Sequence, residues 1–201
     1  MPSTSEDAAK ADVSIEARIL DAALVQFERV GVKKTTIEDI ARQAEVDRVT
    51  VYRRIGSRDD VVRAVTGREV QRLLAELHDI PSRHELLEDV VVATFVTVVT
   101  RWRAHGLVER MLVLEPDRLL PQLTTEGGSV FTMSVLATIQ ILDAARVERG
   151  LPEIPGLGAR VEVACRVVHS LILQPIGTLD LTTEPALTEF ARTHIVPIIL
   201  R

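Results

Sequence analysis

The sequence predicts an all-α protein, and three observations indicate this fold class. Apolar residues recur at helical spacing through most of the 201 residues. Glycine and proline gather in short stretches between these apolar runs, as in the segment from Gly150 to Gly158. No credible strand is found, so we expect about nine helices.

Four helices are expected in the N-terminal part of the chain, over residues 14–30, 36–44, 48–54 and 57–78. Ser14 is a suitable N-cap for the first helix, and Gly31 directly after it suits a helix C-cap. Thr36 and Ser57 stand at the expected starts of the second and fourth helices. A turn of about three residues separates the second helix from the third.

The rest of the chain is expected to be helical too, with one ambiguous stretch. Residues 86–102 are rich in valine and threonine, which prefer strands. Because the stretch is long, lacks glycine and proline and has no partner run elsewhere, a helix buried on most sides explains it better. Loops are expected at 115–116, 120–121 and 126–128, and helices over 129–148, 159–173 and 184–199. Pro197 should end or kink the last helix.

Composition excludes several classes of protein. The single cysteine, Cys165, leaves no disulfide within the chain and no zinc site built from several cysteines. The opening segment lacks the apolar stretch of a signal peptide, which favours the cytoplasm. The longest apolar region, Val90 to Val99, is too short to cross a bilayer, so we expect no membrane partner.

Charge is distributed unevenly along the chain. The net charge is −5, but residues 33–58 contain seven basic and four acidic side chains, a local charge of +3. The remaining residues therefore carry −8. A locally basic surface on an acidic protein is able to bind phosphate groups, while the acidic remainder discourages non-specific binding to DNA.

The second and third expected helices, with the turn between them, have the spacing of a helix-turn-helix. In this motif the second helix enters the major groove of DNA, and its first residues reach the edges of the bases. Val46, Val51 and Ile55 suit the inner side, which packs on the neighbouring helices. The spacing alone fits equally well an ordinary three-helix packing with a solvated basic surface.

Eight side chains are candidates for contact with DNA. Arg48 suits a guanine, and Val49 suits the methyl group of a thymine. Most of the others suit phosphate groups, which position a protein on DNA without reading its sequence. The full set is Thr36, Arg48, Val49, Thr50, Tyr52, Arg53, Arg54 and Arg58. Whether Arg53 or Arg54 touches a base, or only favours solubility, is left open.

A distinctive pattern runs along the N-terminal residues and consists of the run Ile19–Phe27, Gly31, Thr35–Ala41, Val46 and Thr50–Ile55. This pattern resembles that of the TetR family of transcription regulators. It is specific over roughly residues 14–65, and beyond them only the helix count, the chain length and the closing pair of helices agree.

Three positions depart from the residues that are usual in this family. Glu45 stands where a turn glycine is common, which would strain the turn. Ile55 replaces a common phenylalanine and Arg58 a common lysine, and both keep the apolar or cationic character of the position.

The resemblance implies a ligand-responsive regulator, with repressor as its usual role, that binds a palindromic operator as a homodimer. Residues 1–13 would be a flexible tail, 14–65 the helix-turn-helix domain and 66–201 the effector-binding and dimerisation domain. A small-molecule effector would shift the spacing of the two recognition helices and release the DNA. Repressor and activator are not separable from sequence, because the difference depends on where the operator lies.

An effector site would lie between facing helices of the C-terminal domain, as in other helical bundles. Its candidates combine bulk with a few polar groups, and plain core packing is the alternative for each one. They are Thr94, Phe95, Val98, Trp102, Met111, Leu112, Phe131, Met133 and His169. Because aromatic residues make up 3% of the chain and few buried charges are expected, we expect a mostly apolar effector.

The last two expected helices carry more apolar residues than one small domain needs to cover. A two-fold interface that takes this pair of helices from each subunit would bury the surplus. The candidate interface residues are Val167, Leu171, Leu187, Phe190, Ile195 and Ile198.

No pattern of residues indicates catalysis, a cofactor or a metal. The five histidines lack the i, i+4 pairing of a helical zinc site, and His169 stands among apolar residues that suit a core or pocket position. No nucleophile motif or pair of framed carboxylates is found. The rival function is an all-α carrier or adaptor of small molecules that keeps its three N-terminal helices only for packing.

Overall fold

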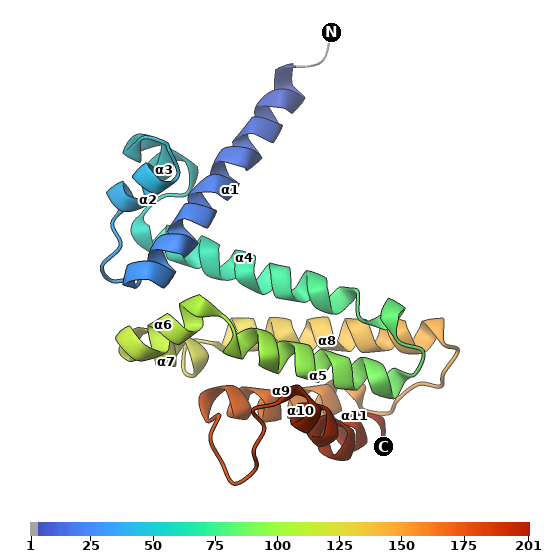
Figure 1. Cartoon of the computed structure of the whole chain (residues 1–201). Coiled ribbons are helices and arrows are strands. Elements are labelled where there is room, and N and C mark those ends of the chain that lie inside the picture. The colour runs from blue at the N-terminus through green and yellow to red at the C-terminus, as the bar shows by residue number, and fades with distance from the viewer. Residues whose placement is uncertain (1–3) are drawn as a thin grey trace. The chain divides into compact units, whose positions relative to one another are not determined.

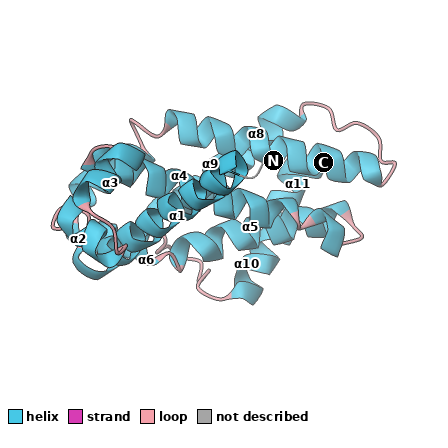
Figure 2. Ribbon diagram, turned by 90° about the horizontal axis from the view of Figure 1, so that it is seen from above, coloured by secondary structure: helices cyan, strands magenta, loops and turns pink. Residues whose placement is uncertain are grey.

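The computed structural model describes residues 4–201, with side chains from residue 15 onward except at 118 and 122. All regular elements in this part of the chain are helices, which confirms the predicted all-α class (Figures 1 and 2). The chain divides into two compact units. Unit 1 comprises the chain up to Gln71 together with Gly106–Leu119, and unit 2 comprises Arg72–His105 and Leu120–Arg201.

Eleven α-helical elements follow one another along the described residues. They are α1 Thr4–Val30, α2 Ile37–Gln43, α3 Arg48–Arg54, α4 Arg58–His78, α5 Leu87–Arg103, α6 Gly106–Leu114, α7 Pro116–Leu123, α8 Gly128–Glu148, α9 Leu157–Leu173, α10 Glu184–Phe190 and α11 Val196–Leu200. A 3-10 turn, Pro81–Arg83, precedes α5, and a π-helical segment, Ala191–Ile195, joins α10 to α11. Residues 184–200 therefore form one continuous helix.

Unit 1 is built on α1, whose apolar stripe forms the centre of a small core. Ile19, Ala23 and Phe27 have no exposed surface, and α2 packs against α1 beside them. Gly31 ends α1 with a φ of 90°, as expected for a helix C-cap. The other large buried residues of this core come from α2, α3 and the first turns of α4, and include Ile40, Val51, Val61 and Val65.

Helix α1 begins at Thr4 instead of Ser14, so Ser14 lies inside the helix and is not its N-cap. Most of the segment that we expected to be a flexible tail is therefore helical, and only residues 1–3 lie outside the described residues. The helix continues through this segment because alanine and charged residues are frequent in it and neither glycine nor proline interrupts it after Pro2.

Helix α7 occupies a region in which sequence predicted loops around two prolines, and helix α6 precedes it in a stretch to which sequence assigned no element. Pro116 is the first residue of α7, where its missing N–H is not needed, whereas Pro121 lies inside the helix. Helix α6 packs on α1 and belongs to unit 1. Two hydrogen bonds fix this region: Arg110 donates to the carbonyl of Arg29 at 2.7 Å, and the Lys33 N–H donates to Glu115 Oε1 at 2.6 Å.

Unit 2 is arranged around α5. Val90, Val91 and Val99 are almost fully buried, and α8, α9 and the helix over residues 184–200 all pack against this element. The valine-rich stretch is thus a helix surrounded on most sides, as predicted. Burial on several sides explains why β-branched residues are tolerated there, since packing outweighs their intrinsic preference for strands.

The C-terminal helix changes its winding just before Pro197. The N–H of Val196 donates to the carbonyl of Ala191, five residues earlier, which is the pattern of a π-helix. Proline lacks an N–H, and its ring crowds the carbonyl four residues before it. The wider turn makes room for this ring, so Pro197 distorts the helix without ending it.

Helix α8 is the one described helix that is long and apolar enough to cross a membrane by length and composition. A single helix of this kind is weak evidence for a membrane protein, because core helices pass the same test. Only 22% of its apolar window is buried within the chain. Helix α8 therefore leaves part of its apolar surface open.

Candidate nucleic-acid interface

Helix α2 begins with a capping box formed by Thr36 and Asp39. Thr36 Oγ1 accepts a hydrogen bond from the Asp39 N–H at 3.1 Å, and the Thr36 N–H donates to Asp39 Oδ2, also at 3.1 Å. The Thr36 hydroxyl also donates to this carboxylate, at 2.6 Å. These bonds from Thr36 hold the pKa of Asp39 below its ordinary value of 3.8. Thr36 is exposed, but its hydroxyl already serves the start of the helix.

Helix α3 begins after a tight turn and has its own cap. The N–H of Val46 donates to the carbonyl of Ala41 at 3.0 Å, which closes the turn after α2. Asp47 is the N-cap of α3 and accepts a hydrogen bond from the Thr50 N–H at 2.6 Å. This bond from the Thr50 N–H holds the pKa of Asp47 below its ordinary value of 3.8.

The two sides of α3 differ sharply in exposure. Val51 has no exposed surface, whereas Val49 is 71% exposed and Tyr52 is 46% exposed. Arg48 and Arg53 are also exposed, and the Arg48 guanidinium lies 5.5 Å from the centre of the Tyr52 ring. Helix α3 thus packs by one side and turns most of its candidate DNA contacts to solvent, as the sequence predicted for a recognition helix.

Three predicted contacts are less open than the others. Thr50 and Arg54 are half-buried. Arg58, also half-buried, donates a hydrogen bond to the carbonyl of Val32 and so ties the first turn of α4 to the connection between α1 and α2. Sequence reasoning gave Arg58 a role toward phosphate, and the structure gives its guanidinium a role inside unit 1.

A polar network that sequence analysis missed links α1 to the end of α2, and the side chain of Gln26 at its centre is buried. Gln26 is 4% exposed and donates to Gln43 Oε1 at 3.1 Å, while Arg29 donates to Gln26 Oε1 at 3.0 Å. The available signal was a glutamine next to Phe27 on the apolar side of α1. These hydrogen bonds fix the end of α2, and therefore the start of the turn, relative to α1.

The nine candidates for an effector site do not gather in one place. Thr94 and Phe95 lie in the core of unit 2, where Phe95 stacks on Phe190 with ring centres 5.8 Å apart. The ring centres of Phe131 and His169 lie 5.9 Å apart. The others are half-buried Val98 and Trp102 on α5, buried Met111 and exposed Leu112 on α6 in unit 1, and exposed Met133 on α8.

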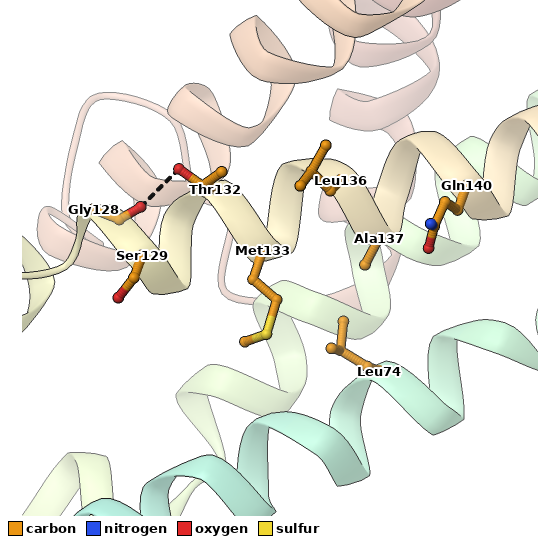
Figure 3. A pocket seen from close by; sticks show the side chains of 8 residues that line it. All are labelled: Leu74, Gly128, Ser129, Thr132, Met133, Leu136, Ala137 and Gln140. Atoms are coloured by element: carbon orange, nitrogen blue, oxygen red, sulfur yellow. Dashed lines mark hydrogen bonds between the residues drawn. The ribbon is translucent and has the colours of Figure 1, made fainter.

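A groove of about 640 Å³ lies in unit 2 between α4 and α8, and Met133 is the one effector candidate that lines it. Its lining is apolar with a few neutral polar groups: Leu74, Gly128, Ser129, Thr132, Met133, Leu136, Ala137 and Gln140. Figure 3 shows Met133 and Ala137 pointing toward Leu74 across the groove. No charged side chain lines it, which suits an uncharged apolar ligand.

The six candidate dimer residues all pack in or against the core of unit 2. Leu187 and Ile195 are 1% and 2% exposed, and Val167, Leu171, Phe190 and Ile198 are partly buried against the same core. The expectation that they face a partner differs from this placement, because the helix over residues 184–200 uses its apolar side to cover α5. Exposed apolar side chains occur on other parts of the described chain, and α8 and α9 are among the helices that carry them.

No group of three or more metal-ligating side chains occurs among the residues that the structure describes. What the described residues do contain is a capped, outward-facing short helix on a three-helix core, followed by a larger helical unit. These features define the class: an all-α protein with a helix-turn-helix of the kind that binds DNA.

Residues 19–65 match the family model described as bacterial regulatory proteins, tetR family. The match extends from α1 into the first turns of α4 and includes both helices of the helix-turn-helix. This segment is therefore similar to the TetR family, which confirms the predicted resemblance. No curated protein matches the chain.

Solved structures of TetR-family proteins share the fold over almost the whole chain. A putative TetR-family regulator from Mesorhizobium loti has a TM-score of 0.64 at 15% identity, covering 93% of this chain and 96% of its own. The repressor AlkX from a Dietzia strain, implicated in biodegradation of n-alkanes, has a TM-score of 0.63 at 20% identity, with 90% and 98% covered. The fatty acid degradation regulator FadR from Bacillus halodurans has a TM-score of 0.61 at 15% identity, with 92% and 94% covered.

Proposed function

We propose that this protein is a repressor that binds a palindromic operator as a homodimer and releases it when a small, mostly apolar effector binds. The observation that carries the DNA-binding part is the exposure of α3. Its leading residues, Arg48 and Val49, are exposed while Val51 anchors the helix in the core. A short helix held in this way is able to enter the major groove with its first turn.

The proposed roles on DNA follow from the chemistry of each exposed side chain. Arg48 reads a guanine through two hydrogen bonds, and Val49 contacts the methyl group of a thymine. Tyr52, Thr50 and the neighbouring arginines bind phosphate groups, which set the register of the protein on the duplex. The ring of Tyr52 lies 5.5 Å from the Arg48 guanidinium and supports its orientation.

Salt dependence of DNA binding tests this proposal. A gel-shift or anisotropy titration on DNA that flanks the gene is expected to show affinity that falls steeply as salt rises, because each neutralised phosphate releases counterions. Tyr52→Phe is expected to weaken binding to all sequences alike. Tight binding of a small molecule without retention of any DNA fragment would favour the carrier function instead.

The homodimer is supported by the apolar side chains that unit 2 leaves exposed. Leu136 and Val147 on α8 are 55% and 60% exposed, and Val163 on α9 is 49% exposed. Helices α8 and α9 pack together, so a two-fold contact would join two helices from each subunit in a four-helix arrangement. The interface that we now propose therefore uses α8 and α9, in place of α9 and the C-terminal helix.

Analytical ultracentrifugation of charged variants tests the interface. Val147→Glu and Val163→Glu are expected to shift the protein from dimer to monomer, since each would bury an unpaired carboxylate between subunits. Val113→Glu on α6 is the matched control, because Val113 is 72% exposed and lies in unit 1. A dimer unchanged in all three variants would place the contact elsewhere.

The groove between α4 and α8 is the proposed effector site. Its uncharged lining favours an apolar ligand with at most a few polar atoms, in keeping with structural neighbours that are named for n-alkane and fatty acid degradation. Release of operator DNA by alkanes and fatty acids of graded length is the direct test. Met133→Glu is expected to abolish release and leave affinity for DNA intact, whereas retained release would exclude this groove.

A further inference from the structure

The turn between α2 and α3 contains a residue in a strained backbone conformation. Glu45 has a φ of 54°, in the left-handed region that residues other than glycine rarely adopt. Within residues 4–201 it is the one non-glycine residue with a positive φ. The turn that sets the direction of α3 is thus held in a conformation that its own sequence disfavours.

Two carbonyl groups of this turn bind the same arginine. The guanidinium of Arg18 on α1 donates to the Ala44 carbonyl at 2.5 Å and to the Glu45 carbonyl at 3.4 Å. Both carbonyls lie just beyond α2, where backbone acceptors lack helical partners and the helix dipole favours a positive charge. Arg18 therefore satisfies acceptors at the point where the chain is strained.

The backbone that carries Arg18 is firmly held. Ile19, the next residue, is fully buried in the core of unit 1, and Arg68 on α4 donates to the carbonyl of Ala17 at 3.2 Å. On the other side of the turn, Asp47 caps α3 through the Thr50 N–H. A continuous set of contacts thus runs from the fixed helix α1, through Arg18 and the turn, to the start of α3.

We propose that Arg18 is a positioning residue for DNA binding, which holds the turn at Ala44 and Glu45 and so fixes the angle at which α3 is presented. The inference rests on the proposed DNA-binding function. Arg18 acts through the protein and does not need to touch DNA. Its help is required because residue 45 has a side chain, and a glycine there would adopt the same φ without strain.

A double-mutant cycle on Arg18 and Glu45 tests the proposal. Dissociation constants are measured at one salt concentration for the DNA site that the wild-type protein selects. Arg18→Ala is expected to weaken binding about tenfold, the effect of losing a hydrogen bond from a charged donor. Adding Glu45→Gly to Arg18→Ala is expected to recover most of this loss, beyond the effect of Glu45→Gly alone.

Two further variants separate strain from charge. Glu45→Gln removes the negative charge but keeps a side chain at the left-handed position, so it is expected not to rescue Arg18→Ala. Arg63→Ala is the matched control for the loss of an exposed cation, because Arg63 on α4 has a 72% exposed side chain and pairs with Asp60 in its own helix. It is expected to leave the dissociation constant almost unchanged.

The salt dependence distinguishes positioning from direct contact with phosphate. A positioning role leaves the salt slope of Arg18→Ala equal to that of the wild type, whereas a lost phosphate contact lowers it by about one. A salt slope that is lower in Arg18→Ala than in the wild type overturns the proposal. It is also overturned if Glu45→Gly and Glu45→Gln restore the DNA affinity of Arg18→Ala to the same extent, or if neither restores it. If Arg18→Ala does not fold, rescue of folding by Glu45→Gly but not by Glu45→Gln supports it, and any other result overturns it.

Failure of the DNA-binding function itself is recognised separately, because the wild-type protein would then retain no DNA sequence. In that case the stability of the turn is measured by amide hydrogen exchange at Val46, whose N–H donates to the Ala41 carbonyl at 3.0 Å. Exchange is expected to be faster in Arg18→Ala and to return to the wild-type rate when Glu45→Gly is added. Unchanged exchange in Arg18→Ala overturns the role of Arg18 in holding the turn.

Discussion

Single residues of α3 differ in whether they pack in the core or face solvent. Val51 has no exposed surface and anchors the helix, whereas its near neighbour Val49 is 71% exposed and has little to pack against. The alternation of inner and outer positions could be predicted from sequence, because it follows from helical spacing and residue type. The use of Arg58 inside unit 1 could not, since a cation near a helix start suits a carbonyl as well as a phosphate.

Val51→Ala is therefore expected to affect the stability of the protein, and Val49→Ala its binding to DNA. Val51→Ala removes buried methyl groups and should lower the free energy of unfolding by about 1–3 kcal/mol. Val49→Ala should leave stability almost unchanged, because the Val49 side chain is exposed, and should weaken binding to DNA, because it removes the proposed contact with a thymine methyl group. Urea unfolding and a DNA titration of both variants check this pair, and a stable Val51→Ala protein would contradict the packing described for α3.

Thr94 is a second residue whose chemistry does not match its surroundings. Its Oγ1 is buried and has no hydrogen-bond partner in the described part of the chain, which costs roughly 1–3 kcal/mol. Thr94→Val keeps the shape and is expected to raise the free energy of unfolding by about 1 kcal/mol. Thr100→Val is the control and is expected not to raise the free energy of unfolding, because the Thr100 hydroxyl already donates to the Val96 carbonyl at 2.7 Å. A less stable Thr94→Val protein would mean that this hydroxyl has a partner.

At the scale of helices, the caps explain which boundaries could be predicted. Thr36 starts α2 and Gly31 ends α1 as expected, because both residue types have a stated physical reason to stand at a helix end. The start of α1 at Thr4 and the helix α7 were missed because serine or proline was taken as a boundary, although both are tolerated within or at the start of a helix. Helix α6 lies in a stretch to which sequence assigned no element.

The caps also predict a dependence of stability on pH. Hydrogen bonds from Thr36, Thr50 and Ser57 hold the pKa values of Asp39, Asp47 and Asp60 below the ordinary value of 3.8. A lowered pKa in the folded state gives stability that is present above the ordinary value and is lost as pH falls through the folded value. The melting temperature should therefore fall below about pH 4, and less steeply when these aspartates are replaced by asparagine. An equally steep fall of the melting temperature with pH in the wild type and in the asparagine variants would contradict a role for the caps.

At the scale of the whole molecule, sequence indicated the fold class and the inner and outer sides of α3 but not the surfaces of the larger unit. Apolar content shows that a helix is buried and does not show what buries it. Leu187 and Ile195 were for this reason assigned to a partner subunit, although they cover α5 within the same chain. The effector candidates were dispersed for the same reason, because only the tertiary arrangement decides which side chains line a groove.

The central claim is that the first turn of α3 reads the bases of DNA. Selection of bound fragments from a random DNA pool, run in parallel with the wild type and with Arg48→Ala, tests it most directly. The wild type is expected to recover a palindrome, and the variant to recover the same site with a relaxed preference at one base position in each half. An identical preference in both proteins, or no enriched sequence with the wild type, would contradict the account.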